Sequence, residues 1–385
     1  NYFFYIQYMD ILFEYMLRKN KVLCIVYDRK DSDRPVVKRF LALNSCEKIP
    51  YSTEEELFSI IESLKKHYDS KEVVVLKEFK GRFFQVCPKT PRMICCNYRL
   101  VNTGFGCFYN CAYCYLQSYL NSFGILVFSN IEDILVEFEN FLNQRDKNTV
   151  YRIGTGEYTD SLMLDDISMI GRLLVERAAE CDGVMIELKT KTDNIDHLLG
   201  IKNKGKSVVG FSLNSIENAE KYELGAVSVK ERIIAAKRAV DSGFLAAFHF
   251  DPIIYSSDWS GKYGEVLSII SNEIDSSKIA WISMGCFRYS PSFKDIIRKN
   301  HPEEMLTLGE LVSSRDGKFR YPHQLRRDVY TMFNKMIKDT IGDVYTYMCM
   351  ESDDMWRDVY NKDYSVSEDL EKDFSLAMRQ RFFEH

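Results

Sequence analysis

Between Tyr98 and Gly285, short apolar segments alternate regularly with segments of helical periodicity. The apolar segments are 98–102, 150–153, 184–188, 207–213, 244–250 and 280–284, and the helical ones include 131–142, 164–179, 228–242 and 263–270. Such alternation predicts parallel strands that are buried beneath helices. Six units are too few for a closed barrel of eight, so we expect an α/β protein with an open (βα)6 partial TIM barrel. The functional residues of such a barrel lie in the loops that follow its strands.

The segment before this pattern predicts a small α/β lead-in. Residues 21–27 and 73–76 are apolar runs typical of short buried strands. Between them, Ser52-Thr53 followed by Glu55-Glu56 forms a capping box, which predicts a helix to about Tyr68. We therefore expect an N-terminal α/β region at 1–90, before a barrel at 91–290.

After Pro291 the alternation ends and a third region, 291–385, is expected. Asp316-Gly317 lies between two short runs in 311–321, which predicts a hairpin turn. Residues 328–360 predict a helix, a short strand at 344–348 and a second helix. The C-terminal region should therefore combine a β-hairpin with helices.

Composition excludes several classes of protein. The 385 residues are 46% hydrophobic and 28% charged, which excludes disorder, collagen and coiled coil. The net charge of −5 does not indicate a strongly basic nucleic-acid binder overall. No apolar run reaches the roughly 20 residues that cross a membrane, so no membrane partner is expected. The apolar segment 2–17 carries Asp10 and Glu14 and lacks a basic leader, so a signal peptide is not expected.

The cysteines point to a reducing compartment. The chain has 11 of them, an odd number, and no secretory signal is expected. This argues against a disulfide framework and favours a cytoplasmic protein.

Three cysteines form the strongest motif in the chain. Cys107-x3-Cys111-x2-Cys114 follows the first predicted barrel strand. Three thiolates without a fourth at matching spacing suit an iron–sulfur cluster that keeps one iron open. A structural zinc site would need a fourth ligand, and the nearest candidates, Cys95 and Cys96, precede the strand. Buried structural cysteines are the other alternative. The position in a loop after a strand favours the cluster.

These residues also carry a family resemblance. Cys107-Phe-Tyr-Asn-Cys111-Ala-Tyr-Cys114 resembles the CxxxCxxC motif of radical S-adenosylmethionine enzymes, whose fold is the open (βα)6 barrel. The continuation Tyr115-Leu116-Gln117, with the segments 191–199, 211–214 and 287–289, resembles the spore photoproduct lyase family. The resemblance extends, with gaps, from about Asn97 to Tyr321.

The resemblance implies a function. In that family a [4Fe-4S] cluster reduces and cleaves S-adenosylmethionine to a 5′-deoxyadenosyl radical, which abstracts hydrogen from a thymine-dimer lesion in DNA. An electron donor such as flavodoxin or ferredoxin is implied as a partner. Cys107, Cys111 and Cys114 would be the cluster ligands.

The resemblance also implies a cosubstrate site. Gly154-Thr-Gly156-Glu157 resembles the superfamily's GGE motif and would meet the ammonium group of S-adenosylmethionine. Lys191 would hold the carboxylate of the cosubstrate, and Ser212 and Asn214 would hydrogen-bond to it. Tyr113 and Tyr115 would flank the cluster, and Arg288 would face the substrate. The proposed catalytic residues are Tyr115, Cys286 and Arg288.

Several of these residues have structural alternatives. Gly154 and Gly156 could serve only a tight turn. Lys191 could be a solvated lysine, and Ser212 a turn or cap residue. Tyr113 is more easily explained as a core aromatic residue. His197, in the matching segment 191–199, is left out of the site as a surface-helix residue.

One position departs from the family. The hydrogen-donor cysteine of the lyases would align in the loop after the second strand, where this chain has Glu157. A carboxylate is not a hydrogen-atom donor, so another thiol must take its place or the reaction ends differently. Cys286, at the end of the sixth strand, is the expected substitute, followed by Cys95 and Cys96. For all three, a buried structural cysteine remains an alternative.

A basic segment at 286–327 is the candidate DNA-binding surface. It contains nine Lys or Arg and five Asp or Glu, a balance of +4, in an acidic chain. Its cations include Arg288, Arg298, Lys299, Lys318, Arg320, Arg326 and Arg327, and Phe319, Tyr321 and His323 lie among them. Cations neutralise phosphates and aromatic rings stack on bases. The alternative is a solvated charged hairpin.

Three functions are therefore compared. The first is a radical S-adenosylmethionine lyase that acts on a pyrimidine lesion in DNA. The second keeps the radical chemistry but has another substrate, and Glu157 with the acidic composition favours it. The third is a non-catalytic metal-binding or nucleic-acid-binding module, which would be colourless after anaerobic reconstitution with iron.

Overall fold

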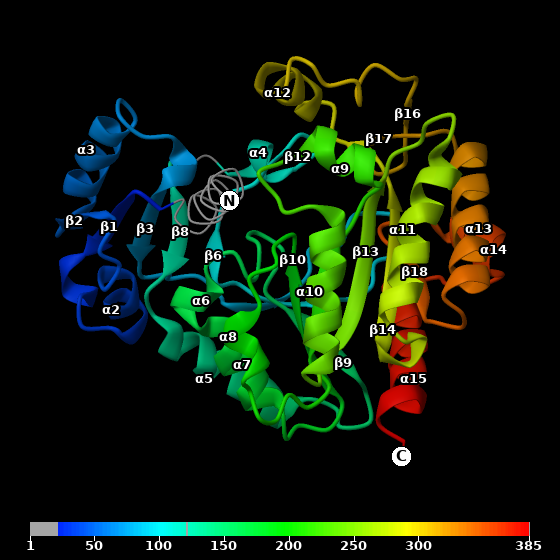
Figure 1. Cartoon of the computed structure of the whole chain (residues 1–385), viewed down its shortest axis with the longest axis horizontal. Helices are drawn as coiled ribbons and strands as arrows, with labels where there is room; N and C mark the ends of the chain where they lie inside the picture. Colours follow the sequence, from blue (N-terminus) through cyan, green and yellow to red (C-terminus); the bar gives the residue numbers. More distant parts are fainter. Residues whose placement is uncertain (1–21, 121, 385) are drawn as a thin grey trace, which may run out of the picture.

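The computed structural model describes residues 22–120 and 122–384 of the chain. Two sheets lie side by side, a small N-terminal one and a large curled one (Figure 1). The segment 2–17, for which no signal peptide is expected, lies outside the described residues. Within those residues, no helix is both long and apolar enough to cross a lipid bilayer.

The large sheet is the predicted open barrel. Its strand order is β18-β14-β13-β11-β10-β9-β5-β4. The six predicted strands are confirmed as β5 (Arg99–Val101), β9 (Tyr151–Gly154), β10 (Val184–Thr190), β11 (Val208–Ser212), β13 (Leu245–Ile253) and β14 (Ile279–Cys286). All six are parallel. The predicted strand near 344–348 is β18 (Thr346–Met348), which adds a parallel strand beside β14. Antiparallel β4 (Phe84–Val86) forms the other edge.

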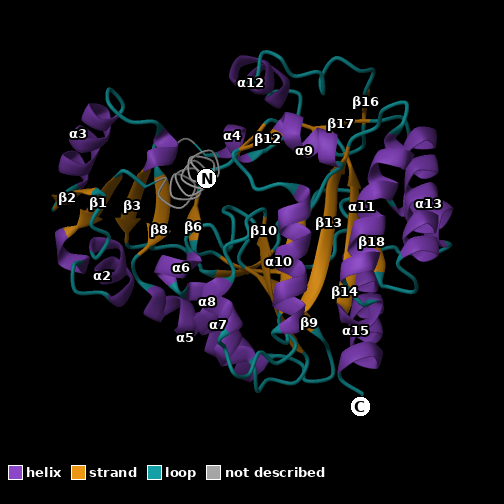
Figure 2. Cartoon of the chain, viewed as in Figure 1, coloured by secondary structure: helices purple, strands orange, loops and turns teal. Residues whose placement is uncertain are grey.

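Helices cover the outer face of this sheet (Figure 2). They include α5 (Ile131–Gln144), α7 (Ile170–Ala178), α10 (Val229–Asp241), α11 (Trp259–Glu273), α13 (His323–Thr340), α14 (Asp353–Tyr360) and α15 (Ser367–Phe382). The predicted capping box at Ser228 and Glu231 begins α10. Buried residues of strands and helices form one continuous hydrophobic core, in which Trp281 and Phe374 pack edge to face. This apolar layer holds the strand ends, and therefore their loops, in place.

One predicted helix is broken. Residues 164–179 form two helices, α6 (Asp165–Ser168) and α7, because Met169 takes a left-handed conformation with φ of 58°. The Asp165 carboxylate accepts hydrogen bonds from the Gly171 amide at 2.8 Å and from Ser168 at 3.0 Å. A Cβ at Gly171 would lie 2.7 Å from that carboxylate. The prediction of a single helix was wrong because the periodicity does not show this side-chain cap.

The small sheet has the order β2-β1-β3-β8-β6. Its strands are β1 (Cys24–Asp28), β2 (Glu47–Tyr51), β3 (Val73–Lys77), β8 (Ile125–Phe128) and β6 (Gly104–Phe105), with α2 (Pro35–Leu41) and α3 (Glu54–Leu64) packed on it. The capping serine or threonine of α3 is Thr53. Two strands of this sheet, β6 and β8, come from beyond residue 90. The segment expected to form the barrel therefore also contributes strands to the small sheet. The three-region division stays a prediction.

The C-terminal hairpin is confirmed. β16 (Val312–Ser313) and β17 (Phe319–Arg320) are antiparallel, and β15 (Arg288–Tyr289) adds a third strand. Gly317 has a φ of +79°, which suits glycine in the turn. With α12 (Phe293–Asn300), the hairpin lies at the end of the molecule where the barrel strands finish (Figure 1).

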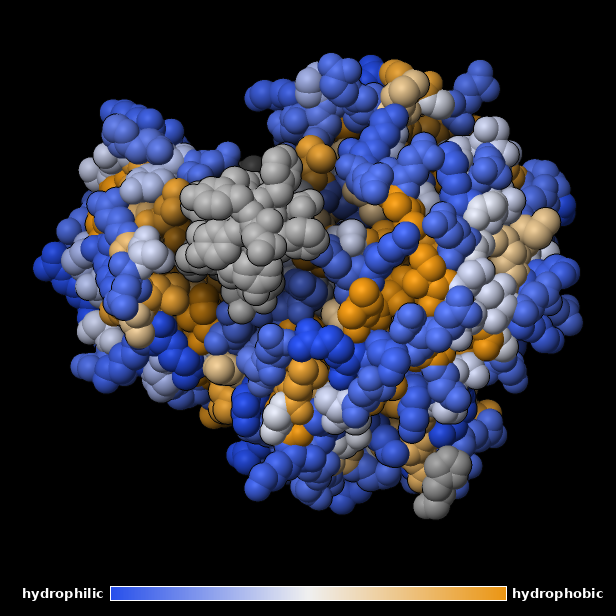
Figure 3. All heavy atoms as spheres, viewed as in Figure 1, coloured by the Kyte–Doolittle hydropathy of each residue, from blue (hydrophilic) through white to orange (hydrophobic). Residues whose placement is uncertain are grey.

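The face seen in Figure 3 is mostly hydrophilic, with an apolar area beside α10. Ile234 on α10 is 55% exposed.

Candidate active site at the open end of the barrel

The cysteine loop is anchored by two other parts of the chain. Within it, β7 (Asn110–Cys111) pairs with β12 (Glu223–Leu224), which follows α9 (Ile216–Tyr222). From the short 3-10 helix before β3, the Lys71 ammonium donates a hydrogen bond to the carbonyl of Cys107 at 3.0 Å. These contacts fix the loop backbone before any cofactor is bound.

The three thiols fit an iron–sulfur cluster. Cys107, Cys111 and Cys114 are all free, and burial raises the pKa of each. Cluster binding would therefore release protons, because iron takes thiolates. Among the described residues, no three His, Cys, Asp or Glu side chains are grouped closely enough for one metal ion. A cluster needs a wider spacing than one ion, since each thiolate binds a different iron.

Polar side chains line the inside of the barrel in rows. Alternate residues of a strand face the same side. Glu187 and Lys189 on β10, His249 and Asp251 on β13, Ser283 and Gly285 on β14, and Tyr347 and Cys349 at β18 share this inner face. The sequence prediction missed these rows because it treated the strands as continuous apolar runs.

The inner end of the barrel holds a closed polar network. His249 lies between Glu187, 2.6 Å from its Nε2, and Ser283, 2.7 Å from its Nδ1. Burial alone would raise the pKa of Glu187, but His249 and Arg152 bring it down to about 2. Burial lowers the pKa of His249, although the carboxylate of Glu187 acts in the opposite direction. The guanidinium of Arg152 also donates to the Tyr347 hydroxyl at 2.6 Å. This network closes the barrel below the candidate site.

The loop after β9 brings Glu157 to the cysteine loop. The Tyr115 hydroxyl donates to the Glu157 carbonyl at 2.6 Å and lies 3.1 Å from its carboxylate. A Cβ at Gly154 would collide with Tyr98, and one at Gly156 would lie 3.0 Å from Lys189. The two glycines therefore have a packing role as well, which the structural alternative anticipated.

Lys191 is already paired. Its ammonium lies 3.1 Å from the carboxylate of Glu223, and Arg232 lies 2.6 Å from the other oxygen. Tyr113 donates its hydroxyl to the same carboxylate. Burial would raise the pKa of Glu223, but Arg232 and Lys191 lower it to about 2. Sequence analysis missed Glu223, which carries no motif and meets Lys191 only through the pairing of β12 with β7.

Ser212 and Asn214 have different positions. Ser212 ends β11, and its carbonyl accepts a hydrogen bond from Arg232 at 2.9 Å. Asn214 is 0% exposed, and its amide joins the Tyr263 hydroxyl at 2.6 Å to the Pro252 carbonyl at 3.1 Å. The side-chain amide of Asn214 is used by these contacts within the fold, and its contact with a cosubstrate stays a prediction.

Cys286 does not face the inside of the barrel. It is 1% exposed and packs in the hydrophobic core, because it lies on the opposite face of β14 from Ser283 and Gly285. Burial raises its pKa to about 12. Arg288, in contrast, holds Asp251 with two contacts of 3.0 and 3.1 Å beside the inner face. A Cβ at Gly285 would lie 2.5 Å from Asp251, so glycine leaves room for this ion pair.

Part of the positive charge of the basic segment is neutralised by acidic residues inside the fold. Arg320 is 1% exposed and pairs with Asp316 at 2.6 Å. Arg326 is buried and lies 3.2 Å from Glu351. The expectation that these two arginines contact phosphates is corrected, since their charges are paired inside the fold. Lys299 and Arg327 remain at the surface, and Lys318 is half-buried.

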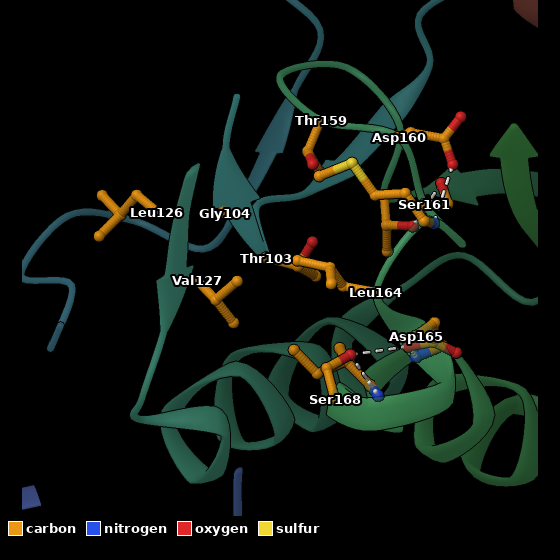
Figure 4. Close-up of a pocket in the computed structure, with 14 residues that line it drawn as sticks. Thr103, Gly104, Leu126, Val127, Thr159, Asp160, Ser161, Leu164, Asp165 and Ser168 are labelled. Carbon is orange, nitrogen blue, oxygen red and sulfur yellow. Dashed lines mark hydrogen bonds between the residues drawn. The ribbon is translucent and has the colours of Figure 1, made fainter. Parts of the chain in front are cut away.

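A small cavity lies behind the loop that follows β9, and Thr155 of the glycine motif is part of its lining. It has a volume of about 30 Å³ and is lined by Thr103, Ser161, Leu164, Asp165 and Ser168, among others (Figure 4). The volume suits one water molecule. His197 lies 2.9 Å from Asp165 behind it, so this histidine is a buried structural residue and not a surface one. Asp160, another lining residue, accepts a hydrogen bond from the Lys191 amide at 2.8 Å, so the cavity adjoins the candidate site.

An open barrel of parallel strands, with three cysteines in the loop after its first strand, defines a radical S-adenosylmethionine enzyme fold. A family model described as spore photoproduct lyase matches residues 93–349. The chain belongs to the spore photoproduct lyase family.

Individual relatives agree with this assignment. A spore photoproduct lyase of Geobacillus sp. (strain Y412MC61) is 26% identical over 208 residues, which cover 53% of this chain and 61% of the relative. One from Clostridium acetobutylicum is 22% identical, over 77% of this chain and 88% of the relative. The chain spans about 60% of the length of the Geobacillus and Bacillus subtilis relatives.

Solved structures show the same fold. A spore photoproduct lyase mutant with bound AdoMet and dinucleoside spore photoproduct superposes with a TM-score of 0.72 at 20% identity, covering 85% of this chain and 98% of that one. A lyase complexed with dinucleoside spore photoproduct gives the same TM-score, identity and coverage. The predicted partial barrel is therefore confirmed.

Proposed function

We propose that this protein is a radical S-adenosylmethionine lyase that repairs a thymine lesion in DNA. The observation that carries the proposal is the family match over residues 93–349, together with the three free thiols of one loop. When bound, a [4Fe-4S] cluster supplies the electron that cleaves S-adenosylmethionine to a 5′-deoxyadenosyl radical. The relatives named above are spore photoproduct lyases, which supports this lesion as the substrate.

Different residues of this chain would bind the cluster and the cosubstrate. Cys107, Cys111 and Cys114 would bind the cluster through their thiolates. Lys191 would meet the carboxylate of the cosubstrate, and Arg232 would then keep Glu223 paired. Glu157 would accept hydrogen bonds from the cosubstrate's ammonium group.

Tyr115 would keep Glu157 in place through its hydroxyl. The backbone at Gly154 and Gly156 would line the same site, and Ser212 would hydrogen-bond to the cosubstrate from the end of β11. Arg288, held by Asp251, would face the lesion. These assignments place every proposed contact at a strand end.

The surroundings of the reaction are also proposed. We place the protein in the cytoplasm, since all its cysteines are free and would stay reduced there. The electron would come from a low-potential protein such as flavodoxin or ferredoxin. DNA would contact the exposed cations of the 286–327 segment, Lys299 and Arg327 among them.

The test is repair of a defined lesion. Anaerobically reconstituted protein, with dithionite and S-adenosylmethionine, should convert dinucleoside spore photoproduct to undamaged thymidine units, followed by mass spectrometry. Cys111→Ala should abolish conversion. Cys46→Ala, which removes a half-buried thiol in the small sheet, is the matched control and should not.

A second candidate is radical chemistry on a substrate other than DNA. The carboxylate of Glu157, where a donor thiol is expected, favours it. Cleavage of S-adenosylmethionine without conversion of the lesion would support this candidate and reject the first. A protein that stays colourless and cleaves no cosubstrate would reject both.

A further inference from the structure

Four cysteines that the cluster does not use are gathered at the barrel. Cys87 follows β4, Cys95 and Cys96 precede β5, and Cys349 follows β18. They are electrostatic neighbours: burial raises the pKa of Cys349, Asp251, Cys96 and Cys95 act in the same direction, and Arg288 acts against them. Burial, Glu157 and Cys96 also raise the pKa of Cys87. The edge strands therefore bring thiols to the inside of the barrel from both sides.

Of these four cysteines, Cys349 has the position that its contacts define most clearly. It shares the inner face with Tyr347, whose hydroxyl meets Arg152 inside the barrel. The amide of Cys349 donates to the Met284 carbonyl at 2.8 Å, which holds it beside the end of β14. Its sulfur lies 3.8 Å from Nη2 of Arg288. Because Asp251 fixes that guanidinium with two contacts, the sulfur has a defined neighbour.

Lys189 lies against the segment that carries Glu157, since a Cβ at Gly156 would lie 3.0 Å from the Cβ of Lys189. The ammonium of Lys189 is influenced by Glu157 and by Cys349, since both of these and Glu187 act to raise its pKa. Within the described residues, no hydrogen bond or ion pair is made by that ammonium. Lys189 therefore adjoins the segment where a donor thiol is missing, and it shares the inner face of the barrel with Cys349.

We propose that Cys349 is the hydrogen-atom donor that replaces the thiol absent at position 157. This rests on the proposed lyase function. Cys349 is partly exposed, whereas Cys286 and Cys95 are buried. It is also next to Arg288, the residue expected to face the lesion. The substrate would lie between the cysteine loop and the end of β18.

The step is balanced as a hydrogen-atom transfer. The S–H bond of Cys349 breaks homolytically and a C–H bond forms on the carbon radical of the released thymine. The unpaired electron moves to sulfur, and the thiyl radical returns to a thiol by taking one electron from the low-potential electron donor and one proton from water. Transfer requires the protonated thiol, and burial, which raises the pKa of Cys349, maintains that form at neutral pH.

The source of the hydrogen can be traced in D2O. A thiol exchanges its hydrogen with solvent, whereas a carbon-bound hydrogen does not. Repaired thymidine from the parent protein should carry a single deuterium, and Cys349→Ala should lose most of this label while it still cleaves S-adenosylmethionine. Cys96→Ala, a half-buried neighbour, is the matched control and should keep the label.

The outcomes separate the two proposals. A parent that cleaves S-adenosylmethionine but repairs no lesion rejects the proposed function, and this inference with it. A parent that repairs with label, and a Cys349→Ala variant labelled to the same extent, rejects only the role of Cys349. Loss of the label in Cys96→Ala, with retention in Cys349→Ala, would also reject it.

A second measurement uses the parent protein alone and does not depend on turnover. Alkylation of the parent's cysteines by iodoacetamide, followed by peptide mass spectrometry, reports access to each thiol. Dinucleoside spore photoproduct should slow the labelling of Cys349 severalfold and leave Cys46 unchanged. Equal labelling of Cys349 with and without a saturating amount of this probe would overturn the proposal.

Discussion

The ammonium of Lys191 and the carboxylate of Glu223 form an ion pair at 3.1 Å, although 32 residues separate them in the chain. Glu223 is brought there by β12, whose partner strand β7 contains Cys111, a proposed cluster ligand. Arg232 shares the same carboxylate. One buried acidic residue thus links the cysteine loop to the lysine expected to bind the cosubstrate.

The first prediction concerns this lysine. Lys191→Ala should weaken binding of S-adenosylmethionine roughly tenfold to a hundredfold, since a charge-assisted contact contributes about 1.5–3 kcal/mol. Equilibrium dialysis on the reconstituted protein would measure it, and the iron content should not change. Lys262→Ala removes an ammonium that pairs with an exposed glutamate and serves as the control. Equal affinity in both variants would place the cosubstrate elsewhere.

The second prediction concerns Glu223. Glu223→Gln should destabilise the cluster-free protein by about 3 kcal/mol, because breaking a buried ion pair leaves Arg232 with an uncompensated charge. Urea unfolding followed by circular dichroism would measure the change. Glu217→Gln, which breaks an exposed pair with Lys262, should cost less than about 1 kcal/mol. Similar losses of unfolding free energy in the two variants would contradict the special role of Glu223.

The third prediction concerns the cluster ligands. Ala in place of Cys107, Cys111 or Cys114 should abolish the iron–sulfur absorbance, because each thiolate binds one iron. Cys46→Ala and Cys181→Ala remove half-buried thiols outside this loop and should reconstitute normally. Visible absorbance and iron analysis after anaerobic reconstitution give the result. Full iron content in Cys111→Ala would refute the assignment.

The fourth prediction concerns pH. Burial lowers the pKa of His249 in the folded protein, whereas an unfolded histidine titrates near 6.5. The unfolded chain therefore binds one proton more as the pH falls below about 6.5. Stability from this residue is present above that pH and is lost below it, by up to about 1.4 kcal/mol per pH unit until the folded pKa is reached.

His249→Gln should remove this part of the pH dependence. Urea unfolding of the cluster-free parent and variant between pH 7.5 and 5.5, as a range about the histidine pKa, would compare the slopes. His323 pairs with Asp358 at the surface, so His323→Gln is the control. Parallel stability curves for the parent and His249→Gln would show that His249 does not contribute.

The barrel could be predicted because its strands and helices follow one another in a regular order. Runs such as Val208–Ser212 are buried on both faces, and their length and β-branched residues identify them without tertiary information. The added parallel strand β18 was predicted as a strand, but its place beside β14 was not. That place depends on the packing of α13 and α15, which the local pattern does not encode.

The candidate site could be predicted only in part. The cysteine motif and the strand ends could be predicted from the sequence, because they depend on local spacing. The inner rows could in principle have been predicted, since Glu187 and Lys189 alternate with the apolar residues Ile186 and Leu188. Glu223 and Cys349 were not, because they reach the site through strand pairings far apart in sequence. Cys286 was misplaced for a related reason: one residue along a strand reverses the face.

The last prediction concerns DNA. Because Arg320 and Arg326 are buried in ion pairs, only the exposed cations of the hairpin region can meet phosphates. Replacing Lys299, Lys318 and Arg327 together by Ala should weaken binding to any duplex and lower the slope of log affinity against log salt by roughly two to three units, since each phosphate contact adds about 0.9. Fluorescence anisotropy of a labelled duplex across a salt series measures both. The matched control replaces Lys48, Lys65 and Lys66, three exposed lysines of the small sheet region, and should leave the slope unchanged. Equal slopes for the two triple variants would show that DNA does not bind at the hairpin. Arg320→Ala leaves Asp316 without its closest partner, so this variant should lower stability and leave the slope unchanged.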